Sequence, residues 1–275
     1  MQWHFEDEEH DEDLYVSPLP QQYVSLQLYR RNAWRVVWIK ENFGLKDWIG
    51  HFMPIFHLKE FYTLQFVDHC QMLDIDEIKT TITNFNKLLI CENGTSNDYY
   101  EEILQRFISS KSLDLDPGVY ERLKNPKYFL IQNYDLLQIS LEDVSPCVMK
   151  LDDLLLVNSK NISIDMPRKT EKTINRFIKH WIKGSNPQME MLRINYPDNV
   201  EFDKAITLRG IKSMEAPENA VRKFKTLIGK DLVIDGGIDI FRLDGTKATI
   251  VFQYTDVFEI YSLLIYVWYP HCIGD

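Results

Sequence analysis

Three histidines and a cysteine, residue types that bind metal ions, lie close together in this sequence: His51, His57, His69 and Cys70. Zinc sites place such ligands at recurring spacings, for example a cysteine pair followed by His-x₃₋₅-His, or a helical His-Glu-x-x-His. Neither spacing is present, and a separation of six residues puts His51 and His57 on different faces of a helix. We therefore predict no metal site and ordinary half-buried histidines at these positions.

A second set has the composition of a serine-hydrolase triad: His180 and Asp165 with either Ser159 or Ser163. No Gly-x-Ser-x-Gly sequence places a serine on the sharp turn that such nucleophiles occupy. His180 also precedes Trp181 just off the apolar face of a helix, which favours an exposed or boundary position. The sequence therefore predicts no catalytic residue.

The pair Gly236-Gly237 is the third candidate, because glycine-rich loops cradle phosphate groups. Such loops precede the N-terminus of a helix, whereas these glycines precede an alternating, strand-like segment. We interpret them as a turn into a hairpin. No cofactor site is predicted, so the sequence favours a protein that is not an enzyme, with an enzyme of an unrecognised type as the alternative.

Charge is unevenly distributed along the 275 residues, whose net charge is −10. Residues 6–13 contain seven acidic groups and no basic one, so the rest of the chain is close to neutral. A nucleic-acid-binding protein would need a clustered basic surface, so we expect no nucleic-acid partner. We predict that residues 1–14 form an acidic disordered tail, with a docking segment for a basic partner as the alternative.

The chain contains no signal-peptide pattern and no apolar run long enough for a membrane helix, so we expect no membrane partner. Four cysteines lie far apart without CxxC spacing, at positions 70, 91, 147 and 272. In such a chain they are expected to be reduced thiols, and the glycosylation sequons at Asn93 and Asn161 would be unused. The prediction is a cytoplasmic or nuclear protein.

The elements that would position any site follow from the periodicity. Residues 23–29 and 34–39 alternate with period 2 and predict a hairpin, and a short helical region from residue 45 is broken at Pro54. Helix-like segments then alternate with short strands. The helices are expected at 75–85, 97–109 and 174–182, and the strands near 87, 112, 161 and 191. Residues 126–132 and 136–141 form a less regular unit, and 151–157 is a helix end or loop.

The helix before the last of these strands has the clearest signature. Its apolar side chains recur at i, i+3, i+4, i+7 and i+8, on one face of a 3.6-residue period: Ile174, Phe177, Ile178, Trp181 and Ile182. Gly184 supplies a left-handed cap and Pro187 prevents the helix from continuing.

The last part of the chain predicts antiparallel structure. Residues 221–229 are interpreted as a short helix or loop. Residues 238–242 and 247–252 alternate on either side of Asp244-Gly245, a type I′ hairpin dipeptide, and 258–268 adds a further strand.

One helix and one short strand per roughly 25–30 residues is typical of leucine-rich-repeat solenoids. We therefore predict an α/β fold, namely an irregular leucine-rich-repeat-like stack of helix-strand units that ends in an antiparallel β meander. An α/β domain with right-handed crossovers is the alternative. The predicted divisions are the tail at 1–14, a hairpin and repeat region at 15–150, and a final domain at 151–275.

The stretch from about Leu154 to Trp268 resembles the nematode F-box-associated domain of the second type. Six short motifs carry the resemblance, at 161–164, 174–187, 189–194, 208–211, 238–250 and 267–268. The positions that match are expected to be structural: Asn175, Phe177, Trp181, Gly184, Asn186, Pro187, Asp244, Gly245, Thr249 and Trp268.

The resemblance implies a non-catalytic protein-interaction module, the substrate-recognition part of a cullin-type (Skp-cullin-F-box) ubiquitin ligase. In that family an N-terminal F-box docks a Skp-type adaptor, and the associated domain is thought to hold a protein target. Leu19-Pro20 is similar to the opening of an F-box, but residues 23–39 alternate like strands. No clear F-box follows, which makes adaptor binding doubtful, so a decoy or orphan receptor unable to bind the adaptor is the alternative.

Overall fold

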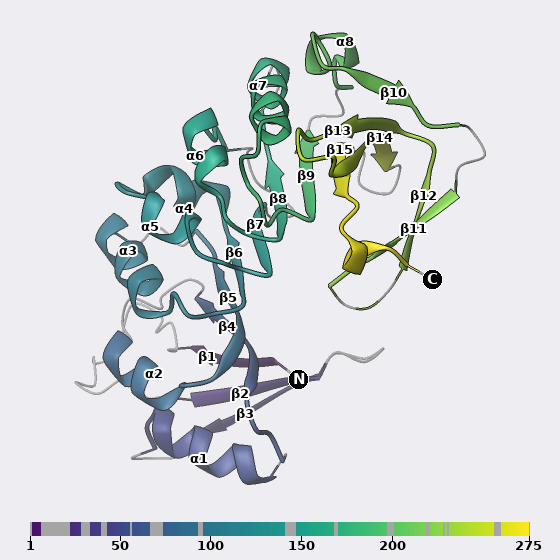
Figure 1. Cartoon of the computed structure of the whole chain (residues 1–275). Coiled ribbons are helices and arrows are strands. Elements are labelled where there is room, and N and C mark those ends of the chain that lie inside the picture. The colour runs from purple at the N-terminus through teal and green to yellow at the C-terminus, as the bar shows by residue number, and fades with distance from the viewer. Residues whose placement is uncertain are drawn as a thin grey trace.

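The computed structural model describes residues 2–6, 23–28, 34–39, 43–55, 57–66, 74–92, 96–140, 147–167, 170–196, 201–217, 221–227, 229, 231–255 and 260–274. Ten strands form one mixed sheet, with helices along one of its faces (Figure 1). The predicted α/β class is confirmed. In the described part of the chain, no helix is long and apolar enough to cross a membrane.

One half of the sheet is parallel, and each of its strands pairs with the next one along the chain. These strands are β4 (Phe61–Phe66), β5 (Phe85–Ile90), β6 (Ser112–Leu115), β7 (Leu136–Ile139), β8 (Asn161–Asp165) and β9 (Met191–Tyr196). The strands predicted near residues 87, 112, 161 and 191 are confirmed. The sheet continues across residue 150, where β7 pairs with β8, so the domain boundary predicted there stays a prediction.

Helices connect these strands: α2 (Ile75–Thr81), α3 (Asn97–Arg106), α4 (Pro117–Arg122), α5 (Lys127–Leu130), α6 (Leu151–Leu156) and α7 (Glu171–Ile182). The predicted helix over 75–85 is too long, because Ile82 caps α2 and Phe85 already begins β5. The segment interpreted as a helix end or loop is the helix α6. The helix with the clearest signature begins three residues earlier than its first apolar position.

Two ladders of buried aliphatic side chains hold the helices onto the parallel strands. Strand register aligns the first ladder, Leu88, Leu113, Leu137, Ile162 and Leu192, and the second, Ile90, Leu115, Ile139, Ile164 and Ile194. Each such side chain contributes roughly 1.5–3 kcal/mol through burial. Buried aliphatic side chains at the same register position of each strand explain why helix-like and strand-like segments alternate in the sequence. The likeness to leucine-rich repeats stays a prediction.

The other half of the sheet is antiparallel, as predicted for the C-terminal meander. From β9 outward it consists of β15 (Ile260–Val267), β14 (Lys247–Thr255), β13 (Ile238–Phe241) and β10 (Ser213–Glu215). The short helix α8 (Lys204–Thr207) precedes β10. The meander joins the parallel half through β15, the last strand of the chain, rather than through the strand that follows β9 in sequence.

A two-stranded ribbon covers one side of this antiparallel half. The prediction of a helix or loop over 221–229 is wrong, because Val221–Lys225 forms β11, which pairs with β12 (Asp231–Asp235). Alternation explains the strand: Arg222 and Phe224 point inward, while the flanking lysines are exposed. Phe224 and Ile234 of the ribbon pack against Leu264, Tyr266 and Cys272, which makes a second small core.

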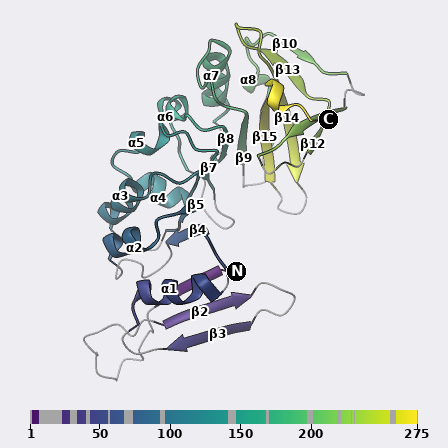
Figure 2. The ribbon, with the colours of Figure 1, turned by 60° about the horizontal axis from the view of Figure 1, so that its bottom comes forward.

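The N-terminal region forms a separate three-stranded sheet of β1 (Gln2–Glu6), β2 (Tyr23–Leu28) and β3 (Trp34–Ile39), followed by α1 (Leu45–Ile55). It lies at the opposite end of the molecule from β10 (Figures 1 and 2). The predicted hairpin is confirmed by the pairing of β2 with β3. Residues 2–6 form β1, which pairs with β2, and most of the acidic run lies outside the described residues, so the disordered tail stays a prediction.

Candidate interaction surface

The predicted absence of a zinc site near His51 stays untested, but two of the four residues can be placed. His51 lies exposed on α1, and its ring makes edge contacts with Phe43 and Phe52. His57 is exposed after that helix, with a left-handed φ of 52°. His69 and Cys70 lie outside the described residues. In the part of the chain that the structure describes, no metal-binding group contains His51 or His57.

The residues considered for a serine-hydrolase triad do not share one element of the fold. Asp165, at the end of β8, accepts a hydrogen bond of 2.8 Å from the Asn195 amide, and burial raises its pKa to about 6. His180 is exposed on α7, and Ser159 is buried before β8. Gly236 and Gly237 form the turn between β12 and β13 with positive φ, as the sequence predicts.

The family-motif residues of α7 join that helix to its neighbours. Asn175 is buried and donates to the carbonyl oxygens of Thr207 and Arg209 at 2.8 and 3.0 Å, which secures the α8 region against α7. Phe177 and Trp181 are almost completely buried in the main core. These three side chains therefore have structural roles.

The residues after α7 have structural roles as well. Asn186 adopts a left-handed φ of 48°, and its amide donates to the carbonyl oxygens of Leu154 and Val157, which belong to the C-terminal turn of α6. The carbonyl of Pro187 accepts a hydrogen bond of 2.7 Å from the Tyr269 hydroxyl. Asn186 thus caps the C-terminus of α6, and the Pro187 carbonyl joins the loop after α7 to Tyr269, close to the C-terminus of the chain.

The end of α7 also contacts the β13–β14 hairpin. Gly184 has a φ of 112°, and its carbonyl accepts a hydrogen bond of 2.9 Å from the guanidinium of Arg242. That guanidinium lies 5.5 Å from the centre of the Trp181 ring, a cation-π distance. One arginine therefore satisfies a carbonyl at the negative end of the helix and covers the tryptophan.

The turn of this hairpin differs from the predicted type I′ turn. Gly245 has a positive φ of 90°, but Asp244 is not among the described non-glycine residues with positive φ. The Gly245 amide donates to the Arg242 carbonyl, while the Thr246 amide bonds to the Asp244 carboxylate at 2.9 Å. The hairpin is confirmed, with a type I turn followed by a left-handed glycine.

The remaining motif residues belong to a polar network between the meander and the ribbon. Asp239 accepts from Arg222 at 2.8 Å, from Thr249 at 2.7 Å and from Lys247 at 2.6 Å. Trp268 in turn donates to the Thr249 hydroxyl at 2.8 Å. Burial alone would raise the pKa of Asp239, but these hydrogen bonds hold it below its ordinary value.

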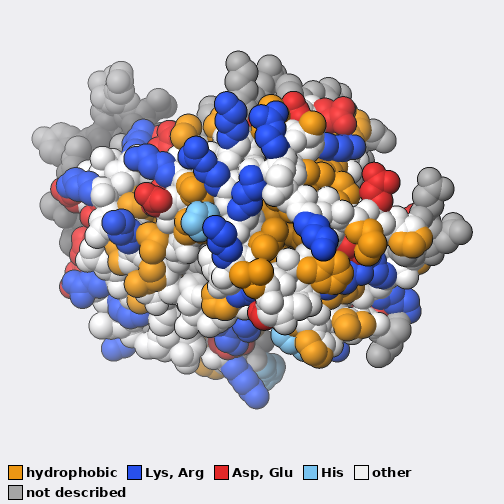
Figure 3. Space-filling model, turned by 45° about the horizontal axis from the view of Figure 1, so that its top comes forward, with side chains coloured by type: hydrophobic (Ala, Val, Ile, Leu, Met, Phe, Trp, Pro, Cys, Tyr) orange, Lys and Arg blue, Asp and Glu red, His pale blue; other side chains and the backbone are white. Residues whose placement is uncertain are grey.

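The exposed side of α7 carries a stripe of positive charge, which we call the α7 basic stripe. Its members recur at i, i+4, i+7 and i+11, which is one helix face: Lys172, Arg176, Lys179 and Lys183. None of them forms an ion pair with a carboxylate of the described residues. Lysine and arginine side chains gather on this side of the molecule (Figure 3). The spacing of these four basic residues is visible in the sequence, but only the apolar face of this helix was considered in the prediction.

An apolar side chain lies at the end of this stripe. Leu243, in the hairpin turn, is 80% exposed, which is the largest value among the exposed large hydrophobic side chains of the described residues. Its backbone amide donates to the carbonyl of Ile182, in the last turn of α7, at 2.9 Å. The stripe and Leu243 together form a basic surface with an apolar end.

Comparison with known proteins finds similarity over part of the chain. The model of the F-box associated family matches residues 125–194. The chain is 28% identical over 138 residues to the F-box associated domain-containing protein sdz-33 of Caenorhabditis elegans, an alignment that covers 50% of this chain and 39% of that relative. No solved structure matches the chain. The matched region contains β7, β8, α7 and the first four residues of β9, and therefore the α7 basic stripe.

Proposed function

From the premise that this chain is a nematode F-box-associated domain protein, we propose that it is a non-catalytic protein-interaction module of the substrate-recognition type found in cullin-type ubiquitin ligases. The observation that carries the proposal is that the two faces of α7 differ in burial. Its motif side chains Asn175, Phe177 and Trp181 are buried and hold neighbouring elements, whereas its charged face is exposed.

The charge of the exposed face specifies the chemistry of the target. The chain as a whole has a net charge of −10, so four cations on one helix face, with no ion pair to a described carboxylate, are a local exception. Such a surface attracts an acidic segment and repels a basic one, mainly through the rate of association. Leu243 adds an apolar contact at one end. We therefore propose a protein target with an acidic segment that contains at least one apolar side chain.

The experiment compares captured proteins between two charge reversals of equal size. The test variant is Lys179→Glu/Lys183→Glu, and the control is Lys46→Glu/Lys127→Glu on α1 and α5, far from the stripe in Figure 1. Proteins bound to each tagged chain are quantified by mass spectrometry at two salt concentrations. We expect a protein that the wild type and the control capture, that the test variant loses, and that is released by salt. Equal capture by both variants would contradict the proposed surface.

The N-terminal region favours a second form of the proposal, a receptor that holds targets without recruiting the ligase. An F-box is a small helical module, whereas β2 and β3 occupy Tyr23–Leu28 and Trp34–Ile39. Purified Skp-type adaptor, mixed with the purified chain in a pull-down, separates the two forms. Stable binding of the adaptor would support a ligase receptor, and no binding at micromolar concentrations would support the decoy form.

Two further proposals concern organisation and location. The two aliphatic ladders support the interpretation of the helix-strand units from β4 to β9 as irregular leucine-rich-repeat-like repeats, with residues 151–275 as the associated domain. Cys147 and Cys272 are free thiols, and the sequon residue Asn161 is buried within β8, where its amide bonds to the Asp135 carbonyl. Both observations support a cytoplasmic or nuclear protein.

A further inference from the structure

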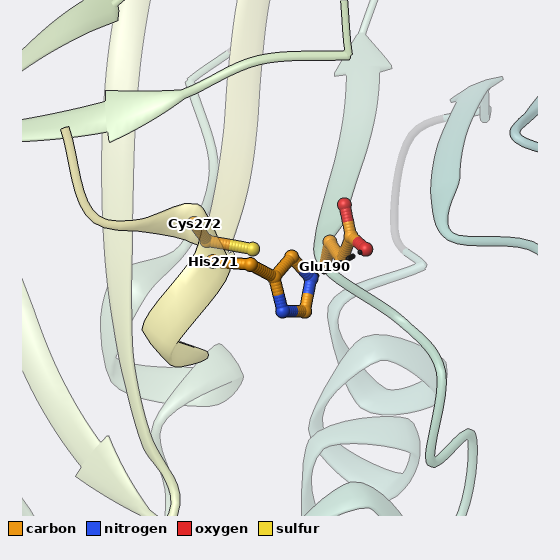
Figure 4. A group of neighbouring side chains, drawn as sticks. All are labelled: Glu190, His271 and Cys272. Atoms are coloured by element: carbon orange, nitrogen blue, oxygen red, sulfur yellow. Dashed lines mark hydrogen bonds and ion pairs between the residues drawn. The ribbon is translucent and has the colours of Figure 1, made fainter.

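A cluster of three side chains lies where the end of the chain meets the start of β9. Glu190 immediately precedes β9, while His271 and Cys272 belong to the 3-10 helix η2 (Pro270–Cys272). Their potential ligand atoms all lie within 4.8 Å of one another, and the His271 Nε2 atom is 2.9 Å from a Glu190 carboxylate oxygen (Figure 4). The sequence did not reveal this group, because Glu190 and His271 are 81 residues apart in the chain.

We propose that Glu190, His271 and Cys272 form a binding site for a divalent zinc ion. Imidazole, thiolate and carboxylate are the three ligand types that zinc uses in proteins. Bond lengths of about 2.0–2.3 Å in a tetrahedral site place neighbouring ligand atoms about 3.3–3.7 Å apart. The observed spacing therefore needs only small side-chain rotations to enclose an ion.

The backbone around each ligand is already held in place. Glu190 donates its amide to the Lys160 carbonyl at 2.7 Å and accepts from the Val267 amide at 2.8 Å. The Cys272 amide bonds to the Tyr269 carbonyl at 2.9 Å. The Tyr269 ring stacks on the His271 imidazole, with ring centres 5.7 Å apart. A preorganised set of ligands reduces the entropy cost of binding an ion.

The charges in the cluster also favour a cation. A carboxylate, a thiolate and a neutral imidazole together carry two negative charges, which a zinc ion neutralises. The His271 side chain is 66% exposed, so a water molecule can reach the fourth coordination position.

An ion at this place would strengthen the closure of the second core. Beyond Cys272, Ile273 forms a bridge with Phe224 of β11, and the Gly274 amide donates to the Lys223 carbonyl at 2.9 Å. Fixing η2 to Glu190 would therefore also fix the ribbon β11–β12 on the meander. Zinc binding should raise the thermal stability of the chain, because the ion binds the folded state only.

The test uses the purified full chain after removal of metal by a chelator. Zinc is titrated in competition with a chromophoric chelator, and cobalt is added separately to detect the absorption band of a thiolate-bound ion. We expect one equivalent of zinc per chain and a thiolate-to-cobalt absorption band. Each of Cys272→Ser and His271→Gln should weaken zinc binding by more than about 100-fold.

Matched controls are Cys147→Ser, a second buried cysteine, and His180→Gln, a second exposed histidine. Both should bind zinc like the wild type. The proposal is overturned if the wild type binds no stoichiometric zinc at micromolar concentrations, or if Cys272→Ser and Cys147→Ser bind it equally well. Circular dichroism of each variant establishes that it is folded, and Glu190→Gln, which preserves the shape of the side chain, provides a third ligand variant.

Discussion

Arg242, in the β13–β14 turn, donates a hydrogen bond of 2.9 Å to the carbonyl oxygen of Gly184, just past the end of α7 and 58 positions earlier in the chain. This contact joins the parallel half of the sheet, which α7 covers, to the antiparallel meander.

Replacement of this arginine should weaken the junction. We expect Arg242→Ala to lower the free energy of unfolding by about 2 kcal/mol, because a charged hydrogen bond and the stacking on Trp181 are lost. Denaturant unfolding followed by tryptophan fluorescence measures the change. Arg209→Ala, at an exposed site, is the control and should cost less than about 0.5 kcal/mol. Similar losses in both variants would contradict the role of Arg242.

Asn186 combines an unusual backbone conformation with two buried hydrogen bonds. We expect Asn186→Ala to destabilise the fold by about 2–4 kcal/mol, because the carbonyls of Leu154 and Val157 lose their donor and alanine is strained at positive φ. Asn186→Gly removes only the hydrogen bonds, so its loss should be smaller. Urea unfolding of the three proteins separates the two effects, and a larger loss for glycine than for alanine would refute this account.

Asp165 should make the stability of the protein depend on pH. Burial raises its pKa to about 6 in the folded state, from an ordinary value near 3.8. The folded protein therefore holds this proton more tightly, and the associated stability is present at pH 4 and is lost as the pH rises through about 6. The loss amounts to about 2–3 kcal/mol at pH 7. Asp165→Asn should remove this dependence, so the stability of the variant relative to the wild type should rise between about pH 4 and pH 6 and stay level above that range.

This comparison is made by urea unfolding at several pH values. Taking the difference between the two proteins cancels the titration of all other groups. The control is Asp152→Asn, which alters an exposed aspartate on α6. A constant difference between Asp165→Asn and the wild type across the pH range would contradict the assignment.

Asp239 should show the opposite dependence. Its pKa lies below the ordinary value in the folded state, so its contribution is present above about pH 4 and is lost as the pH falls through the folded-state pKa. We expect Asp239→Asn to lose about 3 kcal/mol at pH 7, because Arg222 and Lys247 lose their shared counter-charge. Thermal unfolding of the variant and the wild type at pH 7 and pH 3 measures this loss of stability. A loss that is no smaller at pH 3 than at pH 7 would argue against the charged network.

Leu243 allows binding to be separated from folding. Since its side chain is 80% exposed, Leu243→Asp should change the free energy of unfolding by less than about 0.5 kcal/mol. If the surface at the end of the α7 basic stripe holds the target, capture of that target should fall strongly in the same variant. Parallel measurements of melting temperature and capture test this, and unchanged capture would remove Leu243 from the interface.

Local patterns in the sequence were sufficient for many elements of the fold. The strands β6, β8 and β9 and the helix α7 follow from side-chain periodicity, because alternate burial or a 3.6-residue stripe is imposed by the backbone itself. The type of the β13–β14 hairpin turn could not be predicted in the same way. Asp244-Gly245 is compatible with several turn types. The hairpin adopts a type I turn followed by the left-handed Gly245, and in this turn Arg242 contacts the end of α7.

By itself, the sequence determined the α/β class, the alternation of helices and short strands, and the C-terminal meander. Only the tertiary structure decided that the last strand, β15, pairs with β9, that Val221–Lys225 is a strand, and that Glu190 meets His271 and Cys272. The physical reason is that periodicity reports which side of an element is buried, whereas pairing between distant segments depends on which buried surfaces fit together in three dimensions.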